Sequence, residues 1–317
     1  MSEFFEPFHY GFMRDALLVG CLVGAMCAVL SCFLILKGWS LMGDAVSHAV
    51  LPGIVLAYIA GLPLALGAFA AGLLCAVTTG FVKRNCRLKE DTAMGVVFTG
   101  FFAFGIVLFS RTASDLHLDH ILFGNILGIV RSQVIQALVL GSLVLGVTLV
   151  LRKDLLLICF DPGQARVLAL PDRFLNYLLL SLLALAIVVA LQAVGIILVI
   201  AMLIAPGCVA HLWTDRFDKM LFIAVASAVS ATVIGIFASY HFDASTGGCI
   251  VLMQAFFFIL SLLFAPKYGI IGRVRSSARP ACCNRPSGSS PSAGVCWRLA
   301  RRCRLSRSDA SGGRRRD

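Results

Sequence analysis

The chain alternates between long stretches without charged side chains and short segments that carry the Lys, Arg, Asp and Glu. A helix that crosses the hydrocarbon core of a bilayer needs about 20 mostly apolar residues. Seven uncharged stretches are about that long or longer, and they cover residues 16–36, 45–82, 92–110, 132–151, 174–214, 220–242 and 244–266. The pattern therefore predicts a protein that crosses a membrane many times.

Two of these stretches are long enough for two helices each. Residues 45–82 are interrupted by Gly-Leu-Pro at 61–63, and residues 174–214 by Gln-Ala-Val-Gly at 192–195. Gly and Pro disfavour helix interiors, so we expect a break at both places. The fold class predicted is all-α: a polytopic transmembrane helical bundle of about nine spanning helices.

The basic residues predict the orientation of the chain, because short cytoplasmic loops are enriched in Lys and Arg. Residues 83–89 hold two Lys and two Arg, and the loops that alternate onto the same side carry most of the others. The opposite loops hold only Arg111 and Arg131, and Arg14 lies near the N-terminus. We therefore expect the N-terminus outside and the C-terminus inside.

Composition agrees with a membrane protein, since 59% of the 317 residues are hydrophobic and only 14% are charged. The formal net charge of +11 would fit a nucleic-acid partner if it were spread over a folded domain. However, residues 273–317 hold twelve Arg and two Asp, which leaves a net charge of +1 for residues 1–272. We expect no nucleic-acid partner for the transmembrane part.

The same composition divides the chain into a transmembrane domain at 1–272 and a tail at 273–317. The tail is rich in Arg, Ser, Pro and Cys and has too little apolar surface to fold, so we expect it to be disordered. One interpretation is a polybasic segment that binds anionic lipid. The other is a C-terminus produced by a change of reading frame, because Arg without Lys is typical of GC-rich codons.

The segment GDAVSHAVLPG, residues 43–53, places ionisable groups within a membrane-spanning stretch. Asp44 and His48 are four residues apart, hence on one helix face, and both side chains bind divalent metals. Alternatively, Asp44 only caps the helix and His48 is hydrogen-bonded within the bundle. Pro52-Gly53 favours the first interpretation, because a break in the helix frees carbonyl groups, and irregular backbone at membrane depth lines cavities.

This segment resembles the signature of the permease subunits of bacterial metal-ion ABC importers, which take up zinc, manganese or iron delivered by a periplasmic binding protein. The resemblance covers about residues 5–272 and includes the phrases LSCFLILKGWSLMGD, RLKEDTAMG, ILFGNILGI, FDPGQARVLAL, LQAVGIILVIAMLIAPG, TDRF and FAPKYG. These phrases are most similar to the manganese and ferrous-iron branch. The resemblance implies transport of Mn²⁺ or Fe²⁺, with Zn²⁺ as a third candidate, along a path lined by Asp44 and His48.

The resemblance also implies the partners and the location of the protein. We expect a homodimer, or a heterodimer with a related permease, in the bacterial inner membrane, with cytoplasmic ATPase subunits and a periplasmic metal-binding protein. The chain contains no GxxxxGK[ST] phosphate-binding loop. It is therefore expected to be a transport subunit and not an enzyme, with ATP on the partner subunit and no permanently bound cofactor.

The expected ATPase contact lies in the longest inner loop, residues 152–173. Asp161 followed by Pro is a favourable helix start, and the small or apolar Ala165 and Leu168 can enter a groove. The predicted coupling residues are Asp161, Ala165, Arg166 and Leu168. The alternative is a plain interfacial helix.

The outer loop at 111–131 ends in an apolar sequence, so we expect a helical hairpin or an interfacial helix there. His117, Asp119 and His120 are candidates for a metal-attracting rim in this loop. A solvated polar loop explains the same residues.

An ion-coupled secondary transporter is the main alternative function. Such a transporter also has broken helices and polar residues near the membrane centre. It normally needs more intramembrane carboxylates than this chain offers. A membrane-embedded hydrolase is not supported, because the sequence has neither HExxH nor GxSxG.

Overall fold

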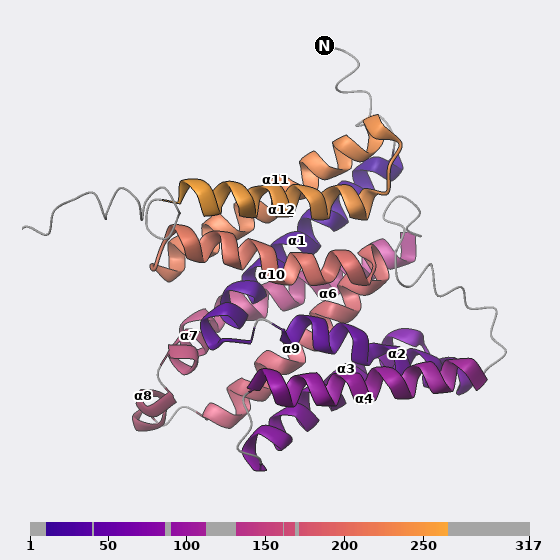
Figure 1. The fold of residues 1–317 in the computed structure, drawn as a ribbon, viewed down its shortest axis with the longest axis vertical. Coiled ribbons are helices and arrows are strands. Elements are labelled where there is room, and N and C mark those ends of the chain that lie inside the picture. Colours follow the sequence, from indigo (N-terminus) through magenta and orange to yellow (C-terminus); the bar gives the residue numbers. More distant parts are fainter. Residues whose placement is uncertain are drawn as a thin grey trace, which may run out of the picture. The chain divides into compact units, whose positions relative to one another are not determined.

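The computed structural model of the chain is all-helical over the residues that it describes, which are 11–39, 41–85, 90–111, 131–160, 162–168 and 171–265. The helices (Figure 1) are α1 (Gly11–Lys37), α2 (Met42–Ile59), α3 (Leu64–Asn85), α4 (Glu90–Arg111), α6 (Arg131–Val150), α7 (Arg152–Phe160), α8 (Pro162–Val167), α9 (Asp172–Val194), α10 (Ile196–Trp213), α11 (Phe217–Phe242) and α12 (Thr246–Phe264).

The nine predicted membrane-spanning segments are confirmed within the described residues, where nine helices are long and apolar enough to cross a bilayer. The two breaks predicted within the long uncharged stretches, at 61–63 and 192–195, are confirmed as well. The α2–α3 connection contains Gly61 and the α9–α10 connection contains Gly195, with φ of 67° and 86°. These angles lie in the left-handed region that glycine adopts without strain, so glycine fixes where each long apolar stretch is divided.

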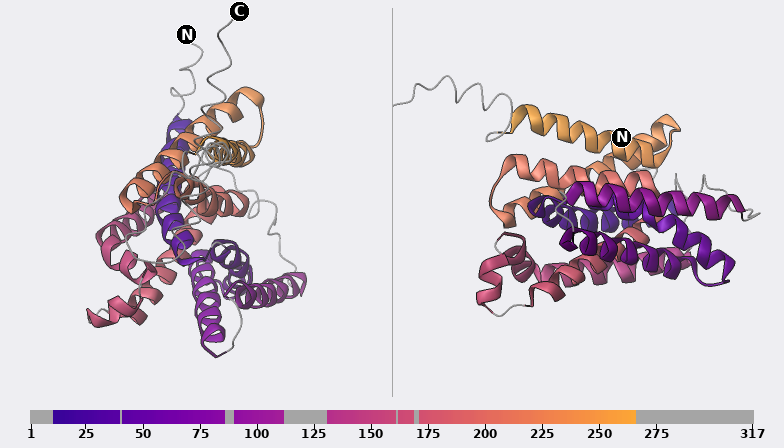
Figure 2. Two further views of the ribbon diagram at one scale, coloured as in Figure 1. Left: turned by 60° about the vertical axis from the view of Figure 1, so that its left-hand side comes forward. Right: turned by 60° about the horizontal axis from the view of Figure 1, so that its bottom comes forward.

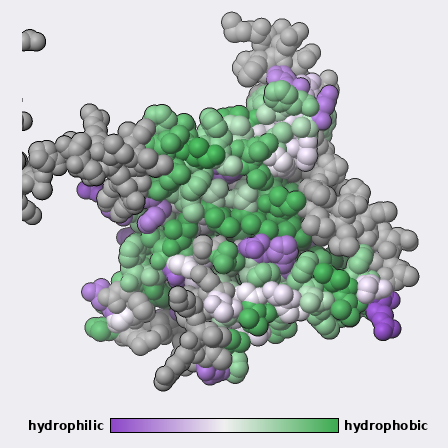
Figure 3. All heavy atoms as spheres, viewed as in Figure 1, coloured by the Kyte–Doolittle hydropathy of each residue, from purple (hydrophilic) through white to green (hydrophobic). Residues whose placement is uncertain are grey.

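Helix α1 lies at the centre of the bundle, with α11 and α12 on one side and the group α2, α3 and α4 on the other (Figures 1 and 2). Its most apolar 18-residue window is 72% buried, and that of α9 is 67% buried. The corresponding windows of α4 and α12 are only 17% buried, although their mean hydropathies of 2.1 and 2.3 are not far below the 2.6 and 2.5 of α1 and α9. The hydrophobic side chains that they expose (Figure 3) are suited to contact with lipid or with another membrane protein.

The predicted break at Pro52-Gly53 is wrong, because α2 continues through both residues. Pro52 removes one backbone donor, which would otherwise bond to the carbonyl of His48. Close packing holds the helix together at this point. A Cβ on Gly53 would overlap the carbonyl oxygen of Gly67 in α3, and a Cβ on Gly105 in α4 would lie 2.9 Å from the Pro52 ring.

The loop at 152–173, which the sequence predicted to be cytoplasmic, is more helical than predicted. Helix α7 follows α6 after a single residue, and α8 begins at Pro162, where the sequence predicted a helix start. Both helices lie together at one end of the bundle (Figure 2). Predictions for residues 112–130 and for the tail at 273–317 fall outside the described residues.

Candidate metal path on helix α2

A turn at the end of α1 determines where α2 begins. Gly38 has φ of 73°, and the backbone N–H groups of Gly38 and Trp39 donate to the carbonyls of Ile35 and Leu34. This is the hydrogen-bond pattern of a Schellman motif, which ends a helix with a left-handed residue. The chain turns back at once, and α2 begins part of the way along the bundle, away from the end that carries α7 and α8 (Figure 1).

The turn is fixed by side-chain contacts as well. Trp39 is buried, and the ammonium of Lys37 lies 4.0 Å from the centre of its ring, within the range of a cation–π interaction. Lys37 also donates a hydrogen bond to the side-chain oxygen of Asn176 in α9. The Trp39 carbonyl accepts the backbone N–H of Met42, so the buried ring is linked directly to the first turn of α2.

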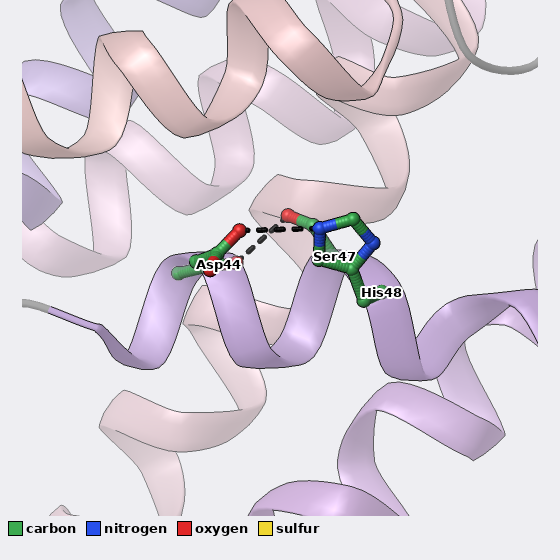
Figure 4. Close-up of polar contacts among 4 residues, drawn as sticks. Asp44, Ser47 and His48 are labelled. Atoms are coloured by element: carbon green, nitrogen blue, oxygen red, sulfur yellow. Dashed lines mark hydrogen bonds and ion pairs between the residues drawn. The ribbon is translucent and has the colours of Figure 1, made fainter. Parts of the chain in front are cut away.

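The structure brings Asp44 and His48 together on one face of α2 (Figure 4). The Asp44 Oδ1 and His48 Nε2 atoms are 3.3 Å apart. About one third of each side chain is exposed, 32% for Asp44 and 29% for His48, whereas most neighbouring residues of α2 are buried. Each group therefore retains access to a ligand.

Asp44 is not the N-cap of α2, so that interpretation is wrong. The N-cap position is Leu41, which makes no side-chain capping bond, and Asp44 is the third residue of the helix. A carboxylate in the first turn is stabilised by the helix dipole, and this orientation leaves its oxygen directed at His48. Beside the pair, the Ser47 hydroxyl donates to the Gly43 carbonyl at 2.7 Å and is satisfied within the helix.

Helices α4 and α10 form the surroundings of the pair. The imidazole of His48 lies 5.2 Å from the ring centre of Phe102 in an edge-on arrangement and 6.2 Å from that of Phe98 in a stacked one. On the other helix, Leu203 packs against Gly43, where a Cβ would lie 3.0 Å from its side chain. The two rings restrict the orientation of the imidazole, so His48 is held in place from outside its own helix.

The geometry of the pair suits a divalent cation. N and O ligands lie about 2.0–2.2 Å from a bound metal ion. When the angle between two of them at the metal lies between the square and the tetrahedral value, their donor atoms are roughly 3.0–3.5 Å apart. The 3.3 Å between the Asp44 and His48 donors lies within that range. Among the described residues no group of three or more His, Cys, Asp or Glu side chains is close enough to hold a metal. The pair alone therefore supplies only part of a coordination shell.

The other predicted site residues are distributed differently. Leu168 is 64% exposed directly after α8, and the neighbouring Val167, which is not among the predicted coupling residues, is 87% exposed. Asp161 and the side chains of Ala165 and Arg166 lie outside the described part of the chain. So do His117, Asp119 and His120.

Several residues near the site were missed by sequence reasoning. Phe98 and Phe102 lie within the uncharged stretch at 92–110, and nothing in the linear pattern distinguishes them from lipid-facing residues. Trp39 lies between two uncharged stretches, after Lys37 and Gly38, and its burial is visible only in the structure.

Most of the chain is similar to known transport proteins of bacterial membranes. Residues 9–265 match the ABC 3 transport family. The chain is 57% identical over 259 residues to the chelated iron transport system membrane protein YfeD of Yersinia pestis, covering 82% of this chain and 87% of that protein. It is 53% identical over 278 residues to the manganese transport system membrane protein MntB of Synechocystis sp., covering 87% and 91%. A solved structure of PsaBC from Streptococcus pneumoniae in complex with Fab has a TM-score of 0.76 and 40% identity, covering 84% of this chain and 97% of that one.

Proposed function

The chain belongs to the ABC 3 transport family and is a multi-pass membrane permease, and from this we propose that it imports a divalent metal ion, Mn²⁺ or Fe²⁺, past Asp44 and His48. The observation that carries the proposal is the environment of the pair: two metal-binding side chains lie together on a partly exposed face of a spanning helix, and rings of α4 hold the imidazole. Ionisable groups in membrane helices normally face a path or a partner. The iron and manganese named in relatives support the same choice of cargo.

The incomplete coordination shell supports a dimer of permeases. Asp44 and His48 provide at most three donor atoms, and Mn²⁺ and Fe²⁺ prefer more. Water or a second permease, identical or related, would supply the others. Carboxylate and imidazole also bind Zn²⁺, so this pair does not by itself select among the three metals.

The remaining partners follow from the proposed role. ATP would be hydrolysed by cytoplasmic ATPase subunits, and a periplasmic protein would deliver the metal to the outer side of the inner membrane. We place the ATPase contact at α8, where Val167 and Leu168 are exposed at the end of the bundle formed by α7 and α8. With α8 on the cytoplasmic side, the nine spans would put the N-terminus outside and the residues after α12 inside.

Uptake assays on two substitutions test the proposed path. Asp44→Asn removes the charge without changing the shape, and His48→Gln retains hydrogen bonding but is a poor ligand. Because ligand-shell substitutions typically cost 10–100-fold in metal affinity, we expect uptake of Mn²⁺ and Fe²⁺ to fall by at least about tenfold. Cells carrying the complete transporter would be compared at equal membrane levels of permease, with Zn²⁺ measured alongside.

Matched controls make the same chemical changes elsewhere. Asp243 lies in the α11–α12 turn with φ of 47°, a conformation that Asn tolerates, and His241 is exposed near the end of α11. Asp243→Asn and His241→Gln should retain uptake. Normal uptake in both Asp44→Asn and His48→Gln would contradict the assignment of the path.

A further inference from the structure

The ammonium group of Lys37 links the end of α1 to two other helices. It donates a hydrogen bond to the side-chain oxygen of Asn176, in the second turn of α9. Its charge also acts on α7, where burial raises the pKa of the Cys159 thiol and the Lys37 ammonium opposes part of that rise. Lys37 and Asn176 are both half-buried, so the two groups meet between helices and not in open solvent.

The end of α1 is already capped without this ammonium. The backbone N–H groups of Gly38 and Trp39 donate to the carbonyls of Ile35 and Leu34, which a basic side chain could otherwise satisfy in a last turn. A positive charge there also interacts favourably with the helix dipole, wherever its side chain points. The bond to Asn176 is a separate feature, because it needs an acceptor on a different helix.

Helix α9 connects Asn176 to the proposed ATPase contact. Only residues 168–171 separate Val167, the last residue of α8, from Asp172, the first residue of α9. Helix α8 also contacts both α7 and α9. Rigid helices and hydrogen bonds between them are the elements through which distant sites are coupled. A displacement of α8 would therefore reach the first turns of α9.

On its other side, Lys37 is linked to the metal-binding pair. Its ammonium lies 4.0 Å from the centre of the Trp39 ring, and the Trp39 carbonyl accepts the backbone N–H of Met42 at 3.1 Å. Met42 is the first residue of α2 and Asp44 is the third. The α1–α2 turn therefore holds the first turn of α2 on one side and α9 on the other.

We propose that Lys37 and Asn176 are positioning residues of the transport cycle, whose hydrogen bond passes movement of α8 and α9 to the first turn of α2 and so to Asp44 and His48. This rests on the proposed function, in which α8 contacts the ATPase and the pair meets the ion. When ATP binding displaces α8, the α1–α2 turn follows α9 because Lys37 holds the two together. Neither residue is a metal ligand in this proposal.

Asn176→Leu is the first test, because it removes the acceptor and leaves Lys37 in contact with Trp39. The complete transporter in proteoliposomes, supplied with Mn²⁺ through its binding protein, would be assayed for Mn²⁺ uptake and for ATP hydrolysis. We expect the ATPase to co-purify normally and the Mn²⁺ moved per ATP to fall by about fivefold or more, the lower end of typical coupling between sites. The apparent affinity for Mn²⁺ should not change, since the metal-binding side chains remain.

Asn176→Asp separates loss of the link from general damage to α9. The carboxylate is close in shape to the amide and accepts from the Lys37 ammonium, so the Mn²⁺ moved per ATP should be retained. If Asn176→Asp lost as much as Asn176→Leu, Asn176 would act through packing and the proposal would be overturned. Asn85→Leu, exposed at the end of α3, is the matched control and should behave like the unmodified protein.

Lys37→Met removes the same link from the other side and keeps an unbranched side chain. The double variant with Asn176→Leu should lose no more coupling than either single variant, because residues that act through one contact are not additive. Losses that multiply would show two independent roles and overturn the proposal. Lys219→Met, exposed in α11, is the control. If Lys37→Met does not assemble, the two substitutions of Asn176 decide the question without it.

The two proposals fail separately. Normal Mn²⁺ uptake per ATP in Asn176→Leu would overturn the link and leave the Asp44–His48 path intact. Loss of the ATPase from Asn176→Leu would also overturn the link, since Asn176 would then serve assembly. Normal uptake in Asp44→Asn would overturn the path itself.

Discussion

Two spanning helices, α2 and α11, each carry an aspartate in the first turn that is paired with a basic side chain. Asp44 lies 3.3 Å from His48, four residues along α2, and Asp218 lies 3.2 Å from Arg152, which belongs to α7. Their surroundings differ, because the Asp44 side chain is 32% exposed and that of Asp218 is 79% exposed. The distance within a pair therefore does not identify a functional site, whereas its environment does.

The environment of Asp44 is built by close contacts from other helices. Helix α4 places two rings beside His48, and α3 and α10 pack against glycines of α2. The Asp218–Arg152 pair is solvated, and such pairs contribute about 0–1 kcal/mol to stability. We thus expect α2 to be sensitive to small changes in packing and the Asp218–Arg152 pair to be insensitive to loss of its charge.

The largest effect is expected for Gly53→Val. The added side chain would meet the backbone of Gly67, which cannot move as a flexible side chain can, and overpacking of this kind costs about 3 kcal/mol or more. The protein should lose thermal stability and insert at low levels. Gly80→Val in α3, where a Cβ would meet nothing within 4 Å, is the control. Equal stability of the two variants would mean that α2 and α3 do not approach as described.

Phe102→Leu should reduce uptake without unfolding the protein. The substitution removes the ring edge that restrains His48, and mispositioning of a ligand costs about 10-fold or more in affinity. The apparent affinity for Mn²⁺ should weaken more than the maximal rate. Phe104→Leu changes an exposed ring of the same helix and should behave like the unmodified protein. An effect of the same size in both would point to general packing of α4.

Ser31→Ala tests the hydrogen bonds between α1 and α10. It removes the side-chain partner in α1 of the Ile204 carbonyl and the Gly207 N–H, and a hydrogen bond of this kind contributes about 0.5–1.5 kcal/mol. Thermal unfolding in detergent would measure the loss. Ser227→Ala, whose hydroxyl bonds only to the Ala224 carbonyl in its own helix, should cost less. A smaller loss for Ser31→Ala than for Ser227→Ala would contradict this role.

The smallest effect is expected for Asp218→Asn. An exposed pair is screened by salt and stabilises by at most about 1 kcal/mol. Uptake should remain within about twofold of the unmodified protein, in contrast to Asp44→Asn. If Asp218→Asn lost as much uptake as Asp44→Asn, the two pairs would not differ in function as described.

Length and hydrophobicity are local properties, so the sequence by itself determined the nine spans and both breaks. It also placed Asp44 and His48 on one face, because residues four apart are neighbours on any helix. The start of α8 followed from Pro162, whose missing N–H is tolerated in the first turn.

Tertiary structure decided which of these residues share an environment. Pro52 should weaken its helix, but glycines far apart in the chain, Gly67 and Gly105, let α3 and α4 approach α2, which continues through Pro52. The rings beside His48 and the bond from Lys37 to Asn176 also depend on contacts between distant segments. Such contacts leave no repeating pattern in the sequence. They depend on which helix faces meet when nine apolar helices pack together.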